Sequence, residues 1–295
     1  MRNEQRARIA EGAGFLAALD QSGGSTPKAL ELYGIPPSSY GDKTEMFDLM
    51  QTFRARIMTS PVFGGERVLG AILFEQTMDR DVDGIPSPDY LWERKGVVPF
   101  VKVDEGLADP SDGVRLMKPF TKLDSLLARA VERRMFGTKM RSFVSRASAG
   151  GIKTVLDQQF YYAQEILDAG LVPILEPEID IRSTEKAHAE ELLKAGILDR
   201  LQVIPDGSAV MLKLSIPTVD DFYAELIGHP KVLRVVALSG GYSQEEADTR
   251  LARDHGLIAS FSRALVQDLR AQQTDDEFNR TLDAAITAVY RASTT

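Results

Sequence analysis

The sequence contains no cysteine, only three histidines and a single tryptophan among its 295 residues. Without cysteine, the chain has no disulfide bonds, no thiolate metal site and no cysteine nucleophile. The histidines lie in a helical stretch (His188), in the turn GHP (His229) and at a helix end (His255). A catalytic zinc site usually takes histidine ligands from the active site. Because none of the three ends a strand-like segment, we expect no metal.

Long apolar runs and nucleotide-binding motifs are also missing. The longest apolar run, Val68 to Phe74, is far too short to span a membrane, and the N-terminus lacks the apolar core of a signal peptide. No G-x-G-x-x-G or Walker pattern occurs, so we expect no nucleotide cofactor and no cofactor of another kind. The net charge of -8 argues against non-specific nucleic-acid binding. These features predict a cytoplasmic enzyme with neither membrane nor nucleic acid as a partner.

Eight short apolar segments recur along the chain, and several are near-continuous apolar runs. Such runs are typical of strands buried on both faces of a parallel sheet. The segments are 14–20, 69–76, 98–104, 136–142, 171–179, 209–217, 232–240 and 256–264. Between them, stretches such as 44–58 carry apolar residues three and four positions apart, as amphipathic helices do. Repeated strand–helix units predict an α/β fold, a (β/α)8 TIM barrel with right-handed parallel crossovers.

An open, doubly wound sheet is the competing architecture for the same alternation. No low-complexity tract or Pro/Gly/Ser-rich linker divides the chain, so we interpret residues 1–295 as a single domain. Ser243, followed three residues later by Glu246, predicts a capped helix start, and Gly170 and Gly256 are expected helix ends.

Charged residues occupy alternate positions of these segments, in their C-terminal halves. They are Asp20, Lys102 with Asp104, Lys139 with Arg141, Glu176 with Glu178, Lys213 and Arg263. Side chains two positions apart share a strand face, and barrel enzymes build their active sites at the C-terminal ends of the strands. A structural plug of ion pairs is the alternative for any one of these charges. Six strands that place amines and carboxylates at the same end favour an active site.

Lys213 stands in the middle of the apolar segment AVMLKLSIP, where a charged side chain is rare. Burial disfavours the ammonium form and makes the amine nucleophilic toward a carbonyl carbon. Repulsion from Lys139, if the two are adjacent, acts in the same direction. Glu176 and Glu178 share one face of the preceding segment. We expect their mutual repulsion to raise the pKa of one of them, which suits a general acid–base group.

Two glycine-rich loops have the composition of phosphate-binding loops. LSGG, with Ser239, Gly240 and Gly241, follows the seventh strand, where barrels often bind phosphate, and Arg263 in the eighth strand would add a cation. QSGGSTPK follows Asp20 directly. Its glycines allow close backbone approach, and Ser22, Ser25 and Lys28 supply donors. Each loop alone is also compatible with a plain turn, but together they favour a substrate with a phosphate at both ends.

The chain resembles class I fructose-1,6-bisphosphate aldolases of the shorter bacterial form. The matching stretches run nearly end to end: AALDQSGGSTPK, ILFEQTMD, VVPFVKVDEGL, FGTKMRS, GLVPILEPEI, MLKLSIP, LSGGYS and ASFSRAL. The resemblance implies a metal-independent (β/α)8 barrel that cleaves fructose 1,6-bisphosphate to dihydroxyacetone phosphate and glyceraldehyde 3-phosphate. Small sugar phosphates are then its partners.

The resemblance also implies a role for each candidate residue. Lys213 forms the Schiff base, and Glu176 is the principal acid–base group, supported by Glu178. Lys139 holds the proton balance near the Schiff base, and Asp20 orients Lys213 and the C4 region. Ser239, Gly240, Gly241 and Arg263 bind the phosphate at the ketone end. The path to the other phosphate is lined by Ser22, Ser25, Lys28, Lys102 and Arg141.

The chain departs from the longer animal and plant members at several of these positions. Ala29 follows Lys28 where those members have a second basic residue, Met140 replaces a tryptophan, and Ser262 stands where they have glycine. The terminal tyrosine of those members is missing from VYRASTT, the end of this chain. Another Schiff-base sugar-phosphate aldolase and a non-catalytic sugar-phosphate-binding protein are the alternatives, and the oligomeric state stays open.

Overall fold

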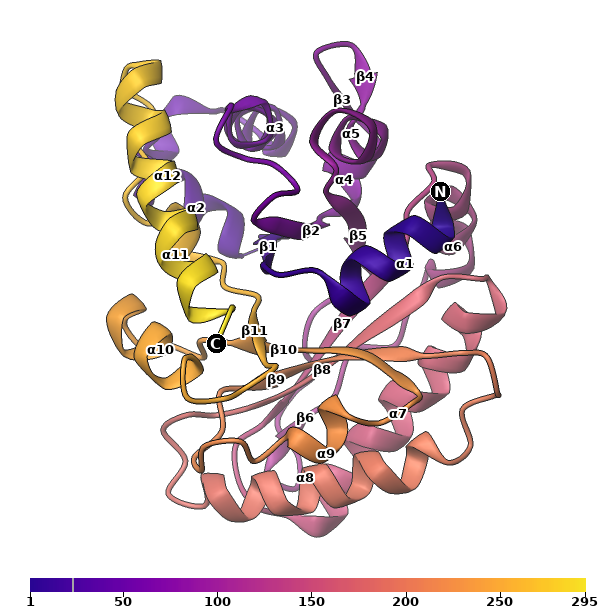
Figure 1. Ribbon diagram of the computed structural model, residues 1–295. Helices are drawn as coiled ribbons and strands as arrows, with labels where there is room; N and C mark the ends of the chain where they lie inside the picture. The colour runs from indigo at the N-terminus through magenta and orange to yellow at the C-terminus, as the bar shows by residue number, and fades with distance from the viewer. Residues whose placement is uncertain (23) are drawn as a thin grey trace.

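Eight parallel strands follow one another in chain order around a nearly closed barrel, with the longer helices outside it (Figure 1). The structure is a computed structural model that describes residues 1–22 and 24–295. Gly23, one of the glycines of the expected loop after Asp20, lies outside the described residues. The barrel strands are β1 (Phe15–Leu19), β2 (Val68–Leu73), β5 (Val98–Lys102), β7 (Gly137–Val144), β8 (Val172–Ile179), β9 (Val210–Ser215), β10 (Val232–Leu238) and β11 (Ile258–Ala259).

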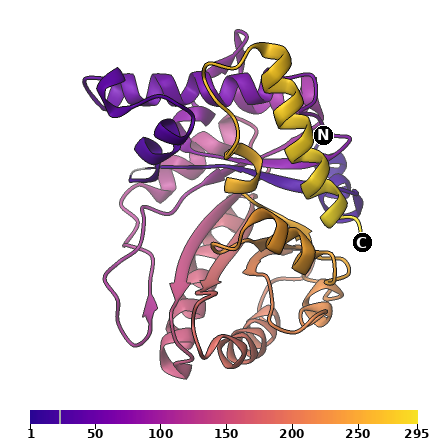
Figure 2. The same ribbon diagram turned by 90° about the vertical axis from the view of Figure 1, so that its left-hand side faces the viewer.

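The helices and the remaining strands connect and cover the barrel strands (Figure 2). The helices are α1 (Arg2–Glu11), α2 (Ser25–Leu32), α3 (Lys43–Thr59), α4 (Glu75–Met78), α5 (Ser87–Asp89), α6 (Leu123–Glu132), α7 (Ala149–Asp168), α8 (Lys186–Leu201), α9 (Ala224–Ile227), α10 (Gln244–Leu251), α11 (Arg263–Val266) and α12 (Asp275–Ala292). Two short turns of other helix types are η1 (Pro37–Ser39) and η2 (Tyr90–Arg94), and the small strands are β3 (Asp81–Val82), β4 (Ile85–Pro86) and β6 (Val114–Arg115). None of these helices is long and apolar enough to cross a membrane, counting only the described residues.

The strand order confirms the predicted barrel and excludes the doubly wound sheet. A doubly wound sheet reverses its strand order at a switch point, whereas here each barrel strand pairs with the next along the chain, from β1 to β11. The first and last strands then come into contact. Within residues 1–22 and 24–295, no ladder of backbone hydrogen bonds joins these two strands. The barrel therefore has a seam between β1 and β11.

The eighth strand is the element that the sequence pattern overestimates most. β11 covers only Ile258–Ala259, whereas segment 256–264 was expected to be a strand. Arg263 is therefore not a strand residue, because it begins the short helix α11 and is exposed there. The expected helix end at Gly256 is also wrong, because α10 ends at Leu251. Ser243 does cap that helix, and its side chain accepts a hydrogen bond from the backbone of Glu246.

The barrel interior is apolar at one end and charged at the other. A cluster of buried apolar side chains fills the end where the strands begin: Leu16, Leu69, Ile72, Val98, Phe100, Phe136, Val172, Ile174, Met211, Val236 and Ile258. Four of the charged residues lie two positions after a residue of this end and so share its inward face. The pairs are Phe100 and Lys102, Gly137 and Lys139, Ile174 and Glu176, and Met211 and Lys213. The apolar layer forms a floor beneath the charges.

Helix α1 closes this floor from below. Ile9, on α1, is fully buried in the same apolar cluster. Arg234, near the start of β10, donates hydrogen bonds to the carbonyl oxygens of Ala10 and Gly12, at 2.7 and 3.0 Å. These bonds satisfy acceptors at the C-terminal end of α1, which the helix itself leaves unpaired. The N-terminal segment is thereby fastened across the strand starts.

Phe100 fits into the floor because glycines stand on both sides of it. A Cβ on Gly137 would lie 2.1 Å from the carbonyl oxygen of Val172 and 2.9 Å from the ring of Phe100. A Cβ on Gly70 would lie 3.0 Å from the same ring. Real Cβ atoms essentially never come as close as 2.1 or 2.9 Å to another heavy atom, and a contact of 3.0 Å is tighter than most, so these strands approach closely because both positions lack a side chain.

We expect Gly137→Ala to lower the free energy of unfolding by about 1–3 kcal/mol, because overpacking beside the Val172 backbone forces the strands apart. Gly64→Ala is the matched control, since the nearest heavy atom to a Cβ there is 3.8 Å away. Urea unfolding followed by circular dichroism measures both. Equal stability of the two variants would contradict the close-packing argument.

Candidate active site

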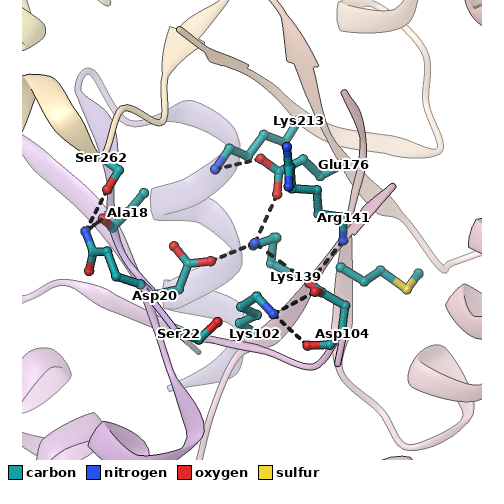
Figure 3. A network of polar contacts seen from close by, with 12 residues as sticks. Ala18, Asp20, Ser22, Lys102, Asp104, Lys139, Arg141, Glu176, Lys213 and Ser262 are labelled. Atoms are coloured by element: carbon teal, nitrogen blue, oxygen red, sulfur yellow. Dashed lines mark hydrogen bonds and ion pairs between the residues drawn. The ribbon is translucent and has the colours of Figure 1, made fainter. Parts of the chain in front are cut away.

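Lys139 lies at the centre of a network of ion pairs above the apolar floor (Figure 3). Its Nζ is 2.6 Å from Oδ2 of Asp20, 3.0 Å from Oε2 of Glu176 and 3.9 Å from Oδ2 of Asp104. The Lys139 side chain is only 3% exposed. These partners come from the ends of β1 and β5 and from β8, while Lys139 belongs to β7. One ammonium group thus draws together four parts of the barrel wall.

Lys213 on β9 shares Glu176 with Lys139. Its Nζ lies 3.1 Å from Oε1 of Glu176, and the residue is 4% exposed. Each carboxylate oxygen of Glu176 therefore faces a different ammonium group. A distance of 3.1 Å is within the reach that proton transfer between two groups requires. The expected neighbourhood of Lys139, Lys213 and Glu176 is present in the structure.

Burial and ion pairing act in opposite directions on these groups, and ion pairing prevails. Burial alone would raise the pKa of Asp20, but the nearby ammonium groups, Lys139 first, hold it well below its usual range. Burial would likewise raise the pKa of Glu176, yet Lys139 and Lys213 lower it. Burial would lower the pKa of Lys139, but Asp20, Glu176 and Asp104 together raise it. At neutral pH, Lys139 is an ammonium between ionised carboxylates.

The expectation was that repulsion between Glu176 and Glu178 raises the pKa of one of them, and Glu176 is not that one, because its pKa is lowered. The two carboxylates share a strand face, but each has its own cations. Glu178 pairs with Nε of Arg141 at 2.5 Å, whereas Glu176 pairs with the two lysines. For Glu176, attraction to Lys139 and Lys213 outweighs burial and the repulsion from Asp20, so its pKa is lowered. In this arrangement Glu176 is a carboxylate, ready to accept a proton.

Asp104 is a part of the network that the sequence pattern did not single out as a site residue. It lies just beyond β5, where its Oδ1 contacts the ammonium of Lys102 at 2.6 Å and accepts a hydrogen bond from the backbone of Gly106. Its Oδ2 accepts a hydrogen bond from the backbone N–H of Arg141. Because Asp104 bridges β5 to β7, it fixes Lys102 at the edge of the network. Only the alternation of Lys102 and Asp104 hinted at this role.

Ser215 holds β8 and β9 together beside Glu176 and Lys213. Backbone pairing between these strands is found at Ile174 with Met211 and at Leu175 with Leu212. Further along, the Ser215 hydroxyl donates to the carbonyl oxygen of Ile179 at 2.6 Å and accepts from its N–H at 3.0 Å. This fully buried link keeps the two strands in register where the reactive side chains are attached.

The expected phosphate loops lie at the same end of the barrel as the ion pairs. Ser239, Gly240 and Gly241 directly follow β10, which pairs with the strand of Lys213 in the register Val236 to Lys213. Gly240 and Gly241 have φ angles of 60° and 119°, a region that favours glycine. A Cβ on Gly240 would also lie 2.6 Å from Ile181. Among residues 1–22 and 24–295, no hydrogen bond or ion pair joins this loop to the ion-pair network.

The loop after β1 is braced by its own serines. The Ser25 hydroxyl donates to the carbonyl oxygen of Ser22 at 2.9 Å and accepts from the Ser22 N–H at 3.0 Å. Lys28 is exposed on α2. Beside this loop lies a cavity of about 470 Å³, lined in part by Ser22 and Lys102. Lys118 and Lys122 also line it. They come from an irregular stretch with no periodic pattern, so the sequence did not point to them.

The sequence of this chain matches that of one protein family over most of its length. The profile described as "Fructose-bisphosphate aldolase class-I" matches residues 2–267. Over 292 residues the chain is 57% identical to fructose-bisphosphate aldolase class 1 of Synechocystis sp., covering 99% of this chain and 97% of that protein. It is 55% identical over 293 residues to the protein of the same name from Porphyromonas gingivalis, covering 99% of each.

A solved structure shows the same fold at lower sequence identity. The fructose-bisphosphate aldolase of Plasmodium falciparum, determined in complex with TRAP and a small-molecule inhibitor, superposes with a TM-score of 0.78 and 21% identity. The superposition covers 99% of this chain and 94% of that chain. This likeness concerns the barrel fold.

We expect Lys139→Met to lower the free energy of unfolding by about 3–5 kcal/mol at pH 7, because it leaves buried carboxylates without their main cation. Lys213 is then the main cation that still opposes burial, and we expect burial to prevail and to raise the pKa values of Asp20 and Glu176 in the folded variant. A carboxyl with a raised folded-state pKa destabilises the fold at pH 7, and this penalty is relieved as the pH falls toward the unfolded values of about 3.9 and 4.3. In the wild type the pKa values of Asp20 and Glu176 are lowered, so these two groups change its stability little between pH 7 and pH 5. The difference in free energy of unfolding between the wild type and Lys139→Met should therefore become smaller as the pH falls from 7 to 5.

Urea unfolding at pH 7, 6 and 5 measures this gap. Lys153→Met removes an exposed pair with Asp157 on α7 and serves as the control, with an expected change below about 1 kcal/mol. A gap for Lys139→Met that does not depend on pH would contradict the proposed balance of charges.

Proposed function

This chain belongs to the class I fructose-bisphosphate aldolase family, and we propose that its barrel site cleaves fructose 1,6-bisphosphate through a Schiff base on Lys213. The products are dihydroxyacetone phosphate and glyceraldehyde 3-phosphate, and the reaction is reversible. The observation that carries this proposal is a buried lysine amine 3.1 Å from a carboxylate that a second lysine keeps ionised. That pair provides a nucleophile and a proton carrier at one point of a rigid wall.

The first stage forms the Schiff base. The neutral Nζ of Lys213 attacks C2 of the open-chain ketose and gives a carbinolamine. Protonated Glu176 gives a proton to the C2 hydroxyl, which leaves as water, and the iminium ion remains. Glu176 acquires that proton from the ammonium of Lys213, which its Oε1 contacts directly. The carboxylate and the amine thus exchange one proton during this stage.

The second stage breaks the bond between C3 and C4. Glu176, again a carboxylate, accepts the proton of the C4 hydroxyl while the C3–C4 electron pair moves into the C2–C3 bond and neutralises the iminium as an enamine. Glyceraldehyde 3-phosphate departs as the aldehyde. Protonation of the enamine at C3 restores the iminium, and water then releases dihydroxyacetone phosphate and free Lys213. The protonated imine is the electron sink of the reaction.

Lys139 and Asp20 set the charge state that these steps need. The ammonium of Lys139 keeps Glu176 in the ionised form, which is the form that can accept a proton. Asp20 pairs with Lys139 at 2.6 Å and offsets its charge. Asp20 also lies within electrostatic reach of Lys213, in line with an orienting role. Glu178 holds Arg141 at the mouth of the site and acts on Glu176 only as a neighbour on the same face.

The two loops at the strand ends would hold the two phosphates of the substrate. We assign the phosphate at the ketone end to the loop after β10 and to Arg263. The assigned residues of that end are Ser239, Gly240, Gly241 and Arg263. The other phosphate would lie toward the cavity beside Ser22 and Lys102, and we assign Ser25, Lys28 and Arg141 to the path that leads to it. A site with cations at both ends favours a bisphosphate over a ketose with one phosphate.

The cytoplasm is the compartment we propose for this activity. The absence of cysteine and of any helix that could span a membrane, within the part of the chain that the structure describes, is compatible with it. Sugar phosphates are its partners, and the state of assembly remains open.

Borohydride reduction should trap the substrate on Lys213. We expect fructose 1,6-bisphosphate with borohydride to add the mass of the reduced ketose to the peptide that contains Lys213, because only an imine is reduced to a stable amine. Lys213→Ala should gain no covalently attached substrate. Lys153→Ala, on the exposed face of α7, should be labelled to the same extent as the wild type. EDTA should leave the cleavage rate unchanged. Loss of turnover on chelation, with activity retained in Lys213→Ala, would refute the assignment.

Glu176→Gln should lower kcat by about 10²–10⁴-fold, the usual contribution of a general acid–base group. Glutamine keeps the size of the side chain but cannot accept the C4 hydroxyl proton. Glu178→Gln is the matched control, and its kcat should fall much less, since Glu178 contacts Arg141 and neither lysine. Cleavage rates at saturating substrate measure both variants. A kcat near that of the wild type in Glu176→Gln would remove this residue from the mechanism.

A further inference from the structure

The seam between β1 and β11 is crossed by one side-chain hydrogen bond next to the proposed phosphate loops. Nε2 of Gln21, directly after Asp20, donates to Oγ of Ser262 at 2.6 Å. The same Nε2 lies 3.3 Å from the carbonyl oxygen of Ala18. Gln21 precedes Ser22 of one loop, and Ser262 precedes Arg263 of the other. The bond therefore joins the two segments to which we assign the two phosphates.

A buried arginine fixes the orientation of the Gln21 amide. Arg54 on α3 is only 2% exposed, and its NH2 group donates to the backbone carbonyl oxygen of Gln21 at 2.6 Å. The NH1 group of Arg54 donates to the hydroxyl of Thr77 at 2.9 Å. Oε1 of Gln21 lies 3.5 Å from the NH2 group of Arg54. Since a guanidinium group has donors and no acceptor, the amide oxygen must face Arg54.

This orientation decides what the Ser262 hydroxyl can do. With the amide oxygen turned to Arg54, the amide N–H groups face the carbonyl oxygen of Ala18 and the hydroxyl of Ser262. The Ser262 oxygen is therefore an acceptor toward Gln21, and its own proton is free to be donated elsewhere. Within the described residues, no hydrogen bond is found in which the Ser262 hydroxyl is the donor. The residue is only half-buried, so a ligand can reach it.

The position of Ser262 places that proton at the edge where the ketone-end phosphate would bind. The ladder between β10 and β11 continues beyond Ala259, because the backbone of Ser260 donates to the carbonyl oxygen of Ala237 at 2.7 Å. Ser262 and the loop of Ser239 thus emerge from adjacent strands on the same side. Arg263 follows Ser262 immediately and is exposed.

We propose that Ser262 donates its hydroxyl proton to the phosphate at the ketone end of the substrate, and that Gln21 is a positioning residue that turns this hydroxyl toward the phosphate. The inference rests on the proposed function, since it names a further phosphate ligand of the same site. Arg54 acts indirectly: it holds the amide of Gln21 in the orientation in which Ser262 accepts from Gln21 and can donate its own proton. The chain carries this hydroxyl at the position where longer family members have glycine.

The proposal predicts an effect on phosphate recognition alone. Ser262→Ala should weaken the binding of fructose 1-phosphate by about 10- to 100-fold, as expected for one hydrogen bond to a charged group. Binding of unphosphorylated fructose should not change. Ser262→Thr keeps the hydroxyl and should restore most of the affinity. KM for fructose 1,6-bisphosphate should rise in Ser262→Ala while kcat stays near that of the wild type.

Gln21→Met tests the positioning role, because methionine has nearly the same length but no N–H donor. We expect the same selective loss for phosphorylated ligands, smaller than in Ser262→Ala. In the double variant the Gln21→Met change should add almost nothing, since residues that act through one contact are not additive. If Gln21 only held β1 and β11 together, Gln21→Met would lower the thermal stability and would weaken the binding of fructose and of fructose 1-phosphate equally.

Borohydride trapping of fructose 1-phosphate on the enzyme distinguishes a failure of the proposed function from a failure of the role proposed for Ser262. If Lys213 is not labelled in the wild type, the proposed function fails. If Lys213 is labelled but Ser262→Ala requires the same fructose 1-phosphate concentration for half-maximal labelling, the function stands and the role of Ser262 is overturned. Equal weakening of fructose and fructose 1-phosphate in Ser262→Ala would also overturn it.

Discussion

The attraction between the Lys139 ammonium and the carboxylates of Asp20, Glu176 and Asp104 is the interaction on which the site depends. A buried charge costs several kcal/mol unless it is paired, and the loss of one partner leaves the others exposed to the same cost. Lys139 connects β1, β5 and β8 through these contacts. Because Glu176 reaches Lys213 with its second oxygen, the proposed nucleophile belongs to the same network. The shape of the site and the charge state of its proton carrier therefore have one common cause.

The apolar floor makes this network precise. Side chains such as Phe100 and Met211 are fully buried directly beneath the charged residues, and close packing leaves each strand little freedom to shift. Above the apolar floor, where backbone pairing between strands ends, side-chain hydrogen bonds hold neighbouring strands together. Ser215 joins β8 to β9, and the Gln21 bond to Ser262 crosses the seam between β1 and β11. Rigid packing below and hydrogen bonds above hold the reactive groups within reach of one another, as catalysis by positioning requires.

Much of this arrangement could be predicted from the sequence, because alternation along a strand is a local property. The lysine in AVMLKLSIP has to share a face with Met211, whatever the rest of the chain does. The eight apolar segments also predicted the barrel, since repeated strand–helix units have few ways to close. The pattern failed where long-range contacts decide. Arg263 continues an apparently strand-like segment, yet it begins α11, and the pKa of Glu176 falls because Lys139 and Lys213, from other strands, outweigh burial and the charge of Asp20.

The sequence by itself determined the strands, their inward faces and the residue types at the charged end of the barrel, since these follow from the period of two and from the cost of burying charge. Only the tertiary structure decided which opposite charges meet. The curvature of the sheet brings Asp20 of the first strand end to Lys139 in the middle of the barrel, and it brings Gln21 to Ser262 across the seam. Such pairings join residues far apart in the chain, and no local pattern encodes the distance between them, because that distance depends on how all eight strands close around one core.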